Sequence, residues 1–282
     1  MVDSIEEVRR AVRADRDGGK VVGLVPTMGA LHDGHVRLIE ACREWADTVI
    51  VSIFINPTQF GPTEDFQNYP RTLEDDRRRC AEGGASLIFA PKVETMYPRG
   101  DRSTYVEVPS LSDVLEGASR PNHFRGVATV VLKLFQIVGP DLACFGEKDY
   151  QQLLVVRRMV EDLNVPVKIQ GVATVREPDG LALSSRNRYL GPDDRQAATV
   201  LWRALCSAKD LVADGERDPD RVRQRLRETI ESEGRARLDY GEVADAETLE
   251  PLSDWPPGQR ALVLLAVRVG PARLIDNALL PG

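Results

Sequence analysis

Histidine and cysteine are scarce in this chain of 282 residues, and positive charge is not in excess. There are 37 lysines and arginines against 44 aspartates and glutamates, which gives a formal net charge of −7 at pH 7. This balance excludes a globally basic protein that binds nucleic acid through a positive surface. Long apolar runs are also missing, because stretches such as 261–267 fall far short of the ~18 residues that cross a bilayer.

The remaining absences concern targeting and disorder. The first residues, 1–7, do not have the basic and apolar design of a signal peptide, so we expect a soluble, cytosolic protein. Hydrophobic residues make up 42% of the chain, which is enough for well-packed cores and excludes extensive disorder. The length allows one large domain or two ordinary ones.

The four cysteines stand alone at Cys42, Cys80, Cys144 and Cys206, and none forms a CxxC pair. This spacing suits neither a zinc site nor the disulfide framework of a secreted protein. Since they lie within apolar or helical patterns, we interpret them as buried thiols.

In the first two thirds of the chain, short β-rich runs alternate with amphipathic stretches. Strands and helices are predicted in turn at 21–25, 34–45, 48–55, 72–81 and 86–90. After an insertion with a predicted strand at 104–108, the pattern resumes at 127–138, 141–145, 150–163 and 167–172. Such alternation builds a parallel sheet with crossover helices, so the prediction is an α/β fold with a doubly wound, Rossmann-like parallel sheet.

The last third does not alternate in this way. Two polar helices, at 193–212 and 218–233, precede strands near 238–243, 261–269 and 273–277. We therefore expect two domains: residues 1–175, and a smaller C-terminal α+β domain over 176–282 that follows a turn at 177–180. Residues 214–239 carry eight acidic and seven basic side chains, a near-neutral mixture that indicates a solvated helical face rather than a basic arm.

The first predicted strand runs directly into the segment Pro26-Thr27-Met28-Gly29-Ala30-Leu31-His32-Asp33-Gly34-His35, and a helix follows. The glycines let the backbone pass close to a ligand, and the start of a helix offers unpaired N–H groups and a positive dipole end. This corner is therefore a candidate anion site. His32 and His35 add two donors for phosphate oxygens as negative charge moves toward a leaving pyrophosphate.

The His-x-Gly-His spacing resembles the HIGH signature of class I aminoacyl-tRNA synthetases and related nucleotidyltransferases, and a GxGxxG dehydrogenase fingerprint is absent. The usual partner of HIGH is a mobile KMSKS-type loop, and Leu183-Ser184-Ser185-Arg186-Asn187 stands at a comparable place. A third segment, Phe145 to Gln152, follows a predicted strand. There Lys148 can neutralise phosphate charge, while Asp149 can either accept a hydrogen bond from a ribose hydroxyl or cap the helix that follows.

Together with these segments, three others extend the similarity: 56–60 (Asn-Pro-Thr-Gln-Phe), 69–72 (Tyr-Pro-Arg-Thr) and 116–127. In this order, and with Asp179 to Asn187, the chain resembles the pantoate–β-alanine ligase (pantothenate synthetase) family over nearly the whole first domain. Thr58 stands where relatives often have Met, beside the expected pantoate pocket.

The resemblance implies ATP-dependent condensation of (R)-pantoate with β-alanine to pantothenate, in the biosynthesis of vitamin B5 and coenzyme A. Pantoate's carboxylate would attack the α-phosphorus of ATP, and the amine of β-alanine would then displace AMP from pantoyl adenylate. ATP and Mg²⁺ are the implied cofactors, the latter held mostly by phosphate oxygens and water. A homodimer is implied as well, with no nucleic-acid or membrane partner.

The same resemblance assigns the site residues. His35 would be the candidate general acid or charge stabiliser, and His32, Lys148, Ser184 and Arg186 would complete the catalytic set. Gln59 and Gln152 would hold pantoate, and Gln59 would border the β-alanine site. The residues implied in ATP binding are Met28, Gly29, Ala30, Leu31, His32, Asp33, Gly34, His35, Gly146, Glu147, Lys148, Asp149, Val175, Leu183, Ser184, Ser185 and Arg186.

Three other interpretations stay open at this point. A nucleotidyltransferase of the same superfamily would need further Arg or Lys for a phosphorylated acceptor, whereas the neutral amides of Gln59 and Gln152 suit a small hydroxy acid. A tRNA synthetase would carry an anticodon-binding extension, which is not evident. A catalytically silent nucleotide sensor would have no use for both histidines and Lys148. Asp75 and Asp76 are possible outer contacts to magnesium, but we interpret them as ordinary acids on a helix surface.

Overall fold

The computed structural model describes residues 1–62, 64, 66–100 and 103–280. By their contacts the residues form two units. The first comprises Met1–Glu147 and Gln151–Ala173, and the second comprises Lys148–Tyr150 and Thr174–Gly282. Each unit has its own sheet, parallel in the first and antiparallel in the second.

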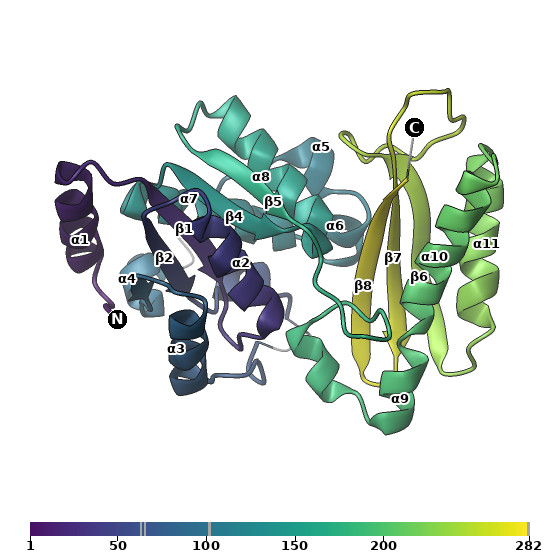
Figure 1. Cartoon of the computed structure of the whole chain (residues 1–282), viewed down its shortest axis with the longest axis horizontal. Helices are drawn as coiled ribbons and strands as arrows, with labels where there is room; N and C mark the ends of the chain where they lie inside the picture. Colours follow the sequence, from purple (N-terminus) through teal and green to yellow (C-terminus); the bar gives the residue numbers. More distant parts are fainter. Residues whose placement is uncertain (63, 65, 101–102, 281–282) are drawn as a thin grey trace. The chain divides into compact units, whose positions relative to one another are not determined.

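The first unit is built on a five-stranded parallel sheet in the order β3-β2-β1-β4-β5 (Figure 1). Its strands are β1 (Val22–Thr27), β2 (Thr48–Ile53), β3 (Leu87–Phe89), β4 (Leu142–Gly146) and β5 (Lys168–Val172). The helices along this part of the chain are α1 (Ile5–Asp17), α2 (Asp33–Arg43), α3 (Leu73–Glu82), α4 (Val93–Met96), α5 (Pro109–Ser112), α6 (Glu116–Ser119), α7 (His123–Val138) and α8 (Tyr150–Asp162), with 3₁₀ turns η1 (Pro57–Gln59) and η3 (Glu147–Asp149). The predicted α/β class and the strand–helix alternation are confirmed.

Both faces of this sheet are covered, as the continuous apolar runs of its strands predict. On one face Val25, Val49 and Val51 pack with Ile39 of α2 and Cys80 of α3. Side chains alternate along a strand, so Leu24 and Ile50 point to the other face, and both are fully buried there. The carboxyl ends of β1 and β4, where ligands bind in sheets of this type, carry the two segments singled out in the sequence.

In the first unit, one predicted strand is absent and one helix was not predicted. The strand predicted at 104–108 does not form, and this stretch is a loop. Its Val106 N–H donates to Thr129 Oγ1 of α7 at 2.9 Å, so a side chain rather than a neighbouring strand satisfies the backbone. Helix α1 was not predicted, although Ser4 and Glu7 have the spacing of a capping box, and Ser4 Oγ does accept from Glu7 N at 3.3 Å.

The second unit has a three-stranded antiparallel sheet, β6-β7-β8, covered on one face by α10 and α11. Its elements are η4 (Ser185–Tyr189), α9 (Pro192–Ala197), α10 (Val200–Ala213), α11 (Pro219–Glu231), β6 (Ala236–Asp245), β7 (Ala261–Val269) and β8 (Ala272–Leu280). The single helix predicted at 193–212 is wrong, because it divides into α9 and α10. At the break, Thr199 N and Thr199 Oγ1 both bond to the Gln196 carbonyl, which tightens the turn.

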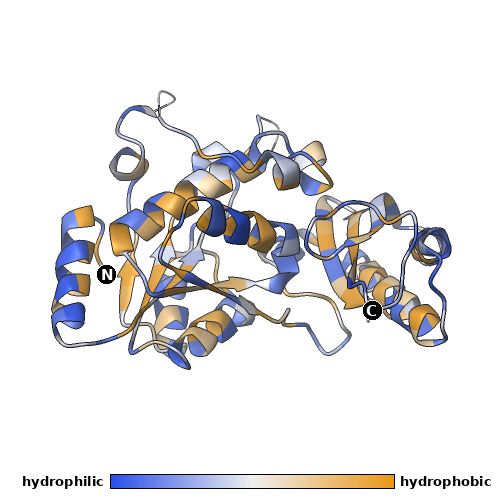
Figure 2. Cartoon of the chain, turned by 90° about the horizontal axis from the view of Figure 1, so that it is seen from above, coloured by the Kyte–Doolittle hydropathy of each residue, from blue (hydrophilic) through white to orange (hydrophobic). Residues whose placement is uncertain are grey.

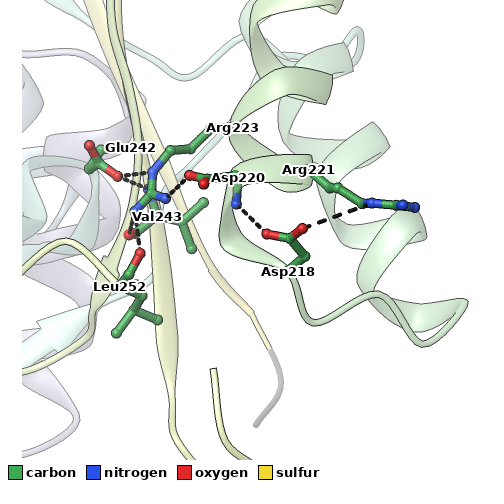
Figure 3. A network of polar contacts seen from close by, with 7 residues as sticks. All are labelled: Asp218, Asp220, Arg221, Arg223, Glu242, Val243 and Leu252. Carbon is green, nitrogen blue, oxygen red and sulfur yellow. Dashed lines mark hydrogen bonds and ion pairs between the residues drawn. The ribbon is translucent and has the colours of Figure 1, made fainter. Parts of the chain in front are cut away.

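The centre of the mixed-charge stretch 214–239 is helical as predicted, because α11 occupies it, whereas residues 236–239 belong to β6. Figure 2 shows most helices orange on one side and blue on another, as expected for helices that cover a core. Arg223 of α11 differs from the solvated side chains predicted for this stretch. Its guanidinium donates to the carbonyl oxygens of Leu252 (2.6 Å) and Val243 (3.0 Å), and it also pairs with Asp220 and Glu242 (Figure 3). This arginine therefore ties α11 to the edge strand β6.

Three cysteines, Cys42, Cys80 and Cys144, are buried free thiols as predicted, and Cys206 is partly exposed. Burial and the nearby carboxylate of Asp76 raise the pKa of Cys80 to about 12, so this thiol stays protonated at neutral pH. Among the described residues, no helix has both the length and the apolar character to span a membrane.

Candidate active site

The corner between β1 and α2 holds the first predicted segment. Gly29 and Ala30 both adopt left-handed backbone angles, with φ of 82° and 52°. A side chain at Gly29 would meet Asp76 Oδ2 at 2.9 Å, so glycine is required there by both its conformation and its space. The left-handed Ala30 costs about 1 kcal/mol or more, and such strain persists only where neighbouring groups hold the backbone in place.

Asp76, on α3, is the group that holds this corner. Its carboxylate accepts hydrogen bonds from Ala30 N (3.1 Å) and Leu31 N (2.7 Å), and also from Thr72 Oγ1 (3.2 Å). The residue is buried, which corrects the interpretation of Asp76 as a surface acid. Its neighbour Asp75 is exposed and pairs with Arg78, as predicted for an ordinary helix-surface acid.

We expect Asp76→Asn to destabilise the fold by about 1–3 kcal/mol, because an amide nitrogen cannot accept from one of the two buried backbone N–H groups. The urea midpoint measures this loss. ATP-dependent activity should fall further than the lost folded fraction explains, since the corner backbone is released. Asp75→Asn, one position away on the exposed side, is the matched control and should change neither quantity. Equal effects of the two substitutions would contradict this role for Asp76.

His32 and His35 lie together at the start of α2, with ring centroids 4.1 Å apart. His32 is the N-cap residue, and its N–H donates to His35 Nδ1 at 3.3 Å. Since Nδ1 of His35 accepts, the proton of the neutral ring lies on Nε2, where it can donate. Asp33, beside them, pairs with Arg79 at 2.7 Å, so its charge is partly offset where an anion is expected.

Gln59 is buried in the turn η1, next to the corner. Asn56 Nδ2 donates to Gln59 Oε1 at 3.1 Å, and Gln59 Nε2 lies 3.0 Å from Met28 Sδ. The amide is thus oriented with its oxygen toward Asn56 and its N–H groups toward the corner. The structure therefore brings together Met28 and Gln59, two of the predicted residues.

Thr58, where relatives often have Met, contributes to the same turn. Its hydroxyl donates to Asn56 Oδ1 at 3.0 Å and lies 3.4 Å from the Tyr97 hydroxyl. The threonine is thus accommodated by polar contacts.

His123, at the start of α7, fixes the backbone of Gln59. Its Nδ1 donates to the Gln59 carbonyl at 2.8 Å, and its Nε2 accepts from Arg120 Nη1 at 3.1 Å. Arg120 forms a two-point ion pair with Glu64. Gly126 makes the close approach possible, because a Cβ there would lie 2.4 Å from the Thr58 carbonyl oxygen. His123, the third of only three histidines, has no role predicted from the sequence.

Burial and the Arg120 charge lower the pKa of His123 to about 4, against an ordinary value of 6.5. Between these values the unfolded chain binds more protons than the folded one, so stability falls as the pH is lowered through this window. We expect His123 to contribute a loss of about 2 kcal/mol between pH 7 and 4.5. Urea unfolding at the two pH values measures it.

His123→Asn is the matched variant, because its amide can donate to the Gln59 carbonyl but does not titrate. It should lose about 2 kcal/mol less on acidification than the natural chain. An unchanged pH dependence in His123→Asn would show that other groups cause the acid sensitivity.

Gln151 and Gln152, at the start of α8, have different environments. Gln151 is buried, accepts from Glu116 N (3.1 Å) and donates to the carbonyl oxygens of Leu111 and Val114 (2.8 Å each). It therefore holds the loop between α5 and α6 in place. Gln152 is partly exposed, which suits its predicted role as the substrate-binding amide of the two.

The remaining predicted residues lie near β4 and in the second unit. Gly146 ends β4, and Glu147 begins η3. The Glu147 carboxylate lies beside Gly171 of β5, where a Cβ would be only 2.9 Å from Glu147 Oε1. Lys148 and Asp149 belong to the second unit by their contacts, and Lys148 Nζ lies 3.7 Å from Asp149 Oδ1.

The segment with Leu183, Ser184, Ser185 and Arg186 follows a short hairpin of the second unit. Leu183 N donates to the Val175 carbonyl at 3.0 Å, so an adenine contact by Val175 would use its N–H or the second lone pair of that carbonyl. Ser184 caps η4 and accepts from Arg186 N at 3.3 Å. Its N-cap position orders the first turn of the predicted phosphate loop.

A protein-built metal centre is not found within the described part of the chain, where no three His, Cys, Asp or Glu side chains gather as ligands. Both oxygens of Asp76 accept backbone N–H groups, which makes this carboxylate a poor metal ligand.

Comparisons with known proteins agree over nearly the full length. A family model described as pantoate-beta-alanine ligase matches residues 1–279. The pantothenate synthetase of Moorella thermoacetica is 54% identical over 280 residues, covering 99% of this chain and 98% of that protein. A crystal structure of pantothenate synthetase from Thermus thermophilus has a TM-score of 0.91 at 50% identity, with 98% of each chain covered. The pantoate-beta-alanine ligase of Francisella tularensis, described as complexed with beta-gamma ATP and beta-alanine, has a TM-score of 0.80 at 35% identity, covering 99% of this chain and 96% of that one.

Proposed function

Since this chain belongs to the pantoate–β-alanine ligase family, we infer that it joins (R)-pantoate to β-alanine through an enzyme-bound pantoyl adenylate. The carboxylate of pantoate attacks the α-phosphorus of ATP and releases pyrophosphate. The amine of β-alanine then attacks the acyl carbon of the mixed anhydride, and AMP leaves with the former carboxylate oxygen. Activation is needed because a free carboxylate resists attack by an amine, whereas the anhydride has a good leaving group.

The observation that carries this proposal is the corner of β1 and α2. There a left-handed backbone, held by the buried carboxylate of Asp76, leads into a helix start with two histidines. Donors fixed before the reaction stabilise charge without reorganisation during it. His35 Nε2–H and His32 are proposed to contact the triphosphate as pyrophosphate departs, by charge stabilisation with or without proton transfer.

Pantoate is assigned to Gln59 and Gln152. The contacts of Gln59 leave its N–H groups on the side of Met28, where they can donate to a carboxylate or hydroxyl oxygen. A neutral amide orients a carboxylate without a tight ion pair, and so preserves its nucleophilicity. The β-alanine site is proposed to border Gln59.

The second unit is proposed to supply the phosphate-neutralising groups Lys148, Ser184, Ser185 and Arg186. Asp149 with Gly146 and Glu147 is assigned to ribose and phosphate, and Val175 to adenine. Mg²⁺ is proposed to accompany ATP through phosphate oxygens and water, where it would neutralise charge on the leaving pyrophosphate. A cytoplasmic homodimer is the proposed state of the protein.

The test is isotope exchange. With pantoate present and β-alanine absent, labelled pyrophosphate should exchange into ATP, because adenylation is reversible before the amine arrives. Pantoate with ¹⁸O in its carboxylate should transfer the label to AMP in the complete reaction, which locates the attack at the α-phosphorus. Exchange that requires β-alanine, or ADP as the product, would overturn the mechanism. Exchange with a phosphorylated acceptor instead of pantoate would favour the nucleotidyltransferase interpretation.

A further inference from the structure

Strand β8 carries two adjacent polar side chains, Asp276 and Asn277, in an otherwise mainly apolar strand. Asp276 lies on the face packed against α10 with Leu274 and Ala278, and only 1% of its side chain is exposed. Successive side chains of a strand point to opposite faces, so Asn277 lies on the other one. Asp276 Oδ1 also accepts from Asn277 N at 2.9 Å, which couples the two residues.

Asn277 holds the backbone of Lys148. Its Nδ2 donates to the Lys148 carbonyl at 2.8 Å, across 129 positions of the chain. Lys148 lies in η3, a single 3₁₀ turn. The hydrogen-bond geometry of such a turn is poorer than that of an α-helix. The bond from β8 therefore restrains the direction in which the Lys148 side chain leaves the backbone.

Asp276 holds the hairpin that precedes Ser184 and Arg186. Its carboxylate forms a two-point ion pair with Arg176, at 2.6 and 2.8 Å. The same guanidinium donates to the Gly180 carbonyl at 3.0 Å and stacks over the Trp202 ring at 4.1 Å. Arg176 is thereby fully engaged inside the unit and is not a candidate phosphate ligand.

A buried ion pair of this kind adds little net stability compared with apolar side chains of similar volume. Its two-point geometry does, however, fix the position of the hairpin strand at Arg176, which pairs with Ala182 just before the loop. The ion pair therefore serves to position the hairpin rather than to stabilise the fold.

We propose that Asp276 and Asn277 are positioning residues for the adenylation step: from neighbouring places on β8 they fix the two segments that present Lys148 and Ser184–Arg186 to the triphosphate. This inference rests on the proposed function, which assigns these segments to phosphate. The second step, attack of β-alanine on pantoyl adenylate, takes place after pyrophosphate has left. It should therefore depend much less on both residues.

Asn277→Asp is the decisive variant, because it keeps the shape of the side chain but replaces the donor with an acceptor. Pantoate-dependent exchange of pyrophosphate into ATP should fall about tenfold, the rate equivalent of one hydrogen bond. Conversion of supplied pantoyl adenylate and β-alanine to pantothenate should stay within about twofold. Asp276→Asn should show the same division between the steps. Ile275→Ala, on the same face as Asn277, is the control and should leave both steps unchanged.

The results of these experiments separate the positioning role from the proposed function. Equal loss in both steps for Asn277→Asp, or no loss in either, would overturn the positioning role. If Asp276→Asn does not fold, as judged by its urea midpoint, the Asn277 result decides alone, because Asn277 is only partly buried. Absence of pantoate-dependent exchange in the natural chain would instead refute the proposed function, before any variant is compared.

Discussion

Replacement of Lys148 by alanine is expected to slow pantoyl adenylate formation about 10²–10³-fold while the fold persists. The residue follows the end of β4 by two positions, where parallel sheets bind ligands, and its side chain is partly buried at 19% exposure. Removing a charge that the protein already holds in place slows the reaction more than removing a charge that moves freely in water. The measurement is pantoate-dependent pyrophosphate exchange at saturating ATP.

Lys168→Ala is the matched control for that experiment. Lys168 begins β5 in the other unit, where its ammonium group stacks over the Trp45 ring at 4.8 Å, and neither residue belongs to the predicted site. The variant should exchange pyrophosphate like the natural chain. Near-normal turnover of Lys148→Ala would refute the role of Lys148, whereas a similar loss in both variants would indicate a general effect of surface charge.

The second large effect is expected at His35. Alanine at this position should slow adenylation by about 10²-fold, because the donor proposed for the departing pyrophosphate is lost. Conversion of supplied pantoyl adenylate should change little, since no pyrophosphate leaves in that step. The two half-reactions, measured separately on the same preparation, give the comparison.

His35→Gln refines the result. Glutamine can present a neutral N–H group near the position of His35 Nε2, but it cannot serve as a general acid at neutral pH. We expect it to recover part of the adenylation rate lost in His35→Ala, as charge stabilisation requires. Recovery of none would point to proton transfer by the imidazole. Equal damage to both half-reactions would instead mean that the corner itself is disrupted.

The corner of β1 and α2 could be predicted because all of its signals are local. Within residues 26–35 the strand ends, glycine permits the left-handed turn, and two histidines stand at the helix start. The alternation of strands and helices could also be predicted from the sequence, because burial of a parallel sheet on both faces imposes continuous apolar runs on its strands. Where local signals were weaker, the prediction at 104–108 was wrong, because high β-propensity does not supply a neighbouring strand.

The roles of Asp76 and His123 could not be predicted in the same way. A charge pattern on α3 does not show which acid faces the core, and Asp75 and Asp76 differ only in the side of the helix they occupy. His123 becomes a neutral donor to Gln59 only because packing removes it from water next to Arg120.

The sequence by itself determined the fold class, the glycine-containing corner between β1 and α2 and the residue types available for the proposed adenylate chemistry, because each depends on neighbours within a few positions. Only the tertiary structure decided which side chains hold these groups in place. The bonds from Asp76 to Leu31, from His123 to Gln59 and from Asn277 to Lys148 span 45, 64 and 129 positions. Contacts over such separations form only when whole helices and strands pack together. The geometry of that packing cannot be predicted from the two contacting residues alone.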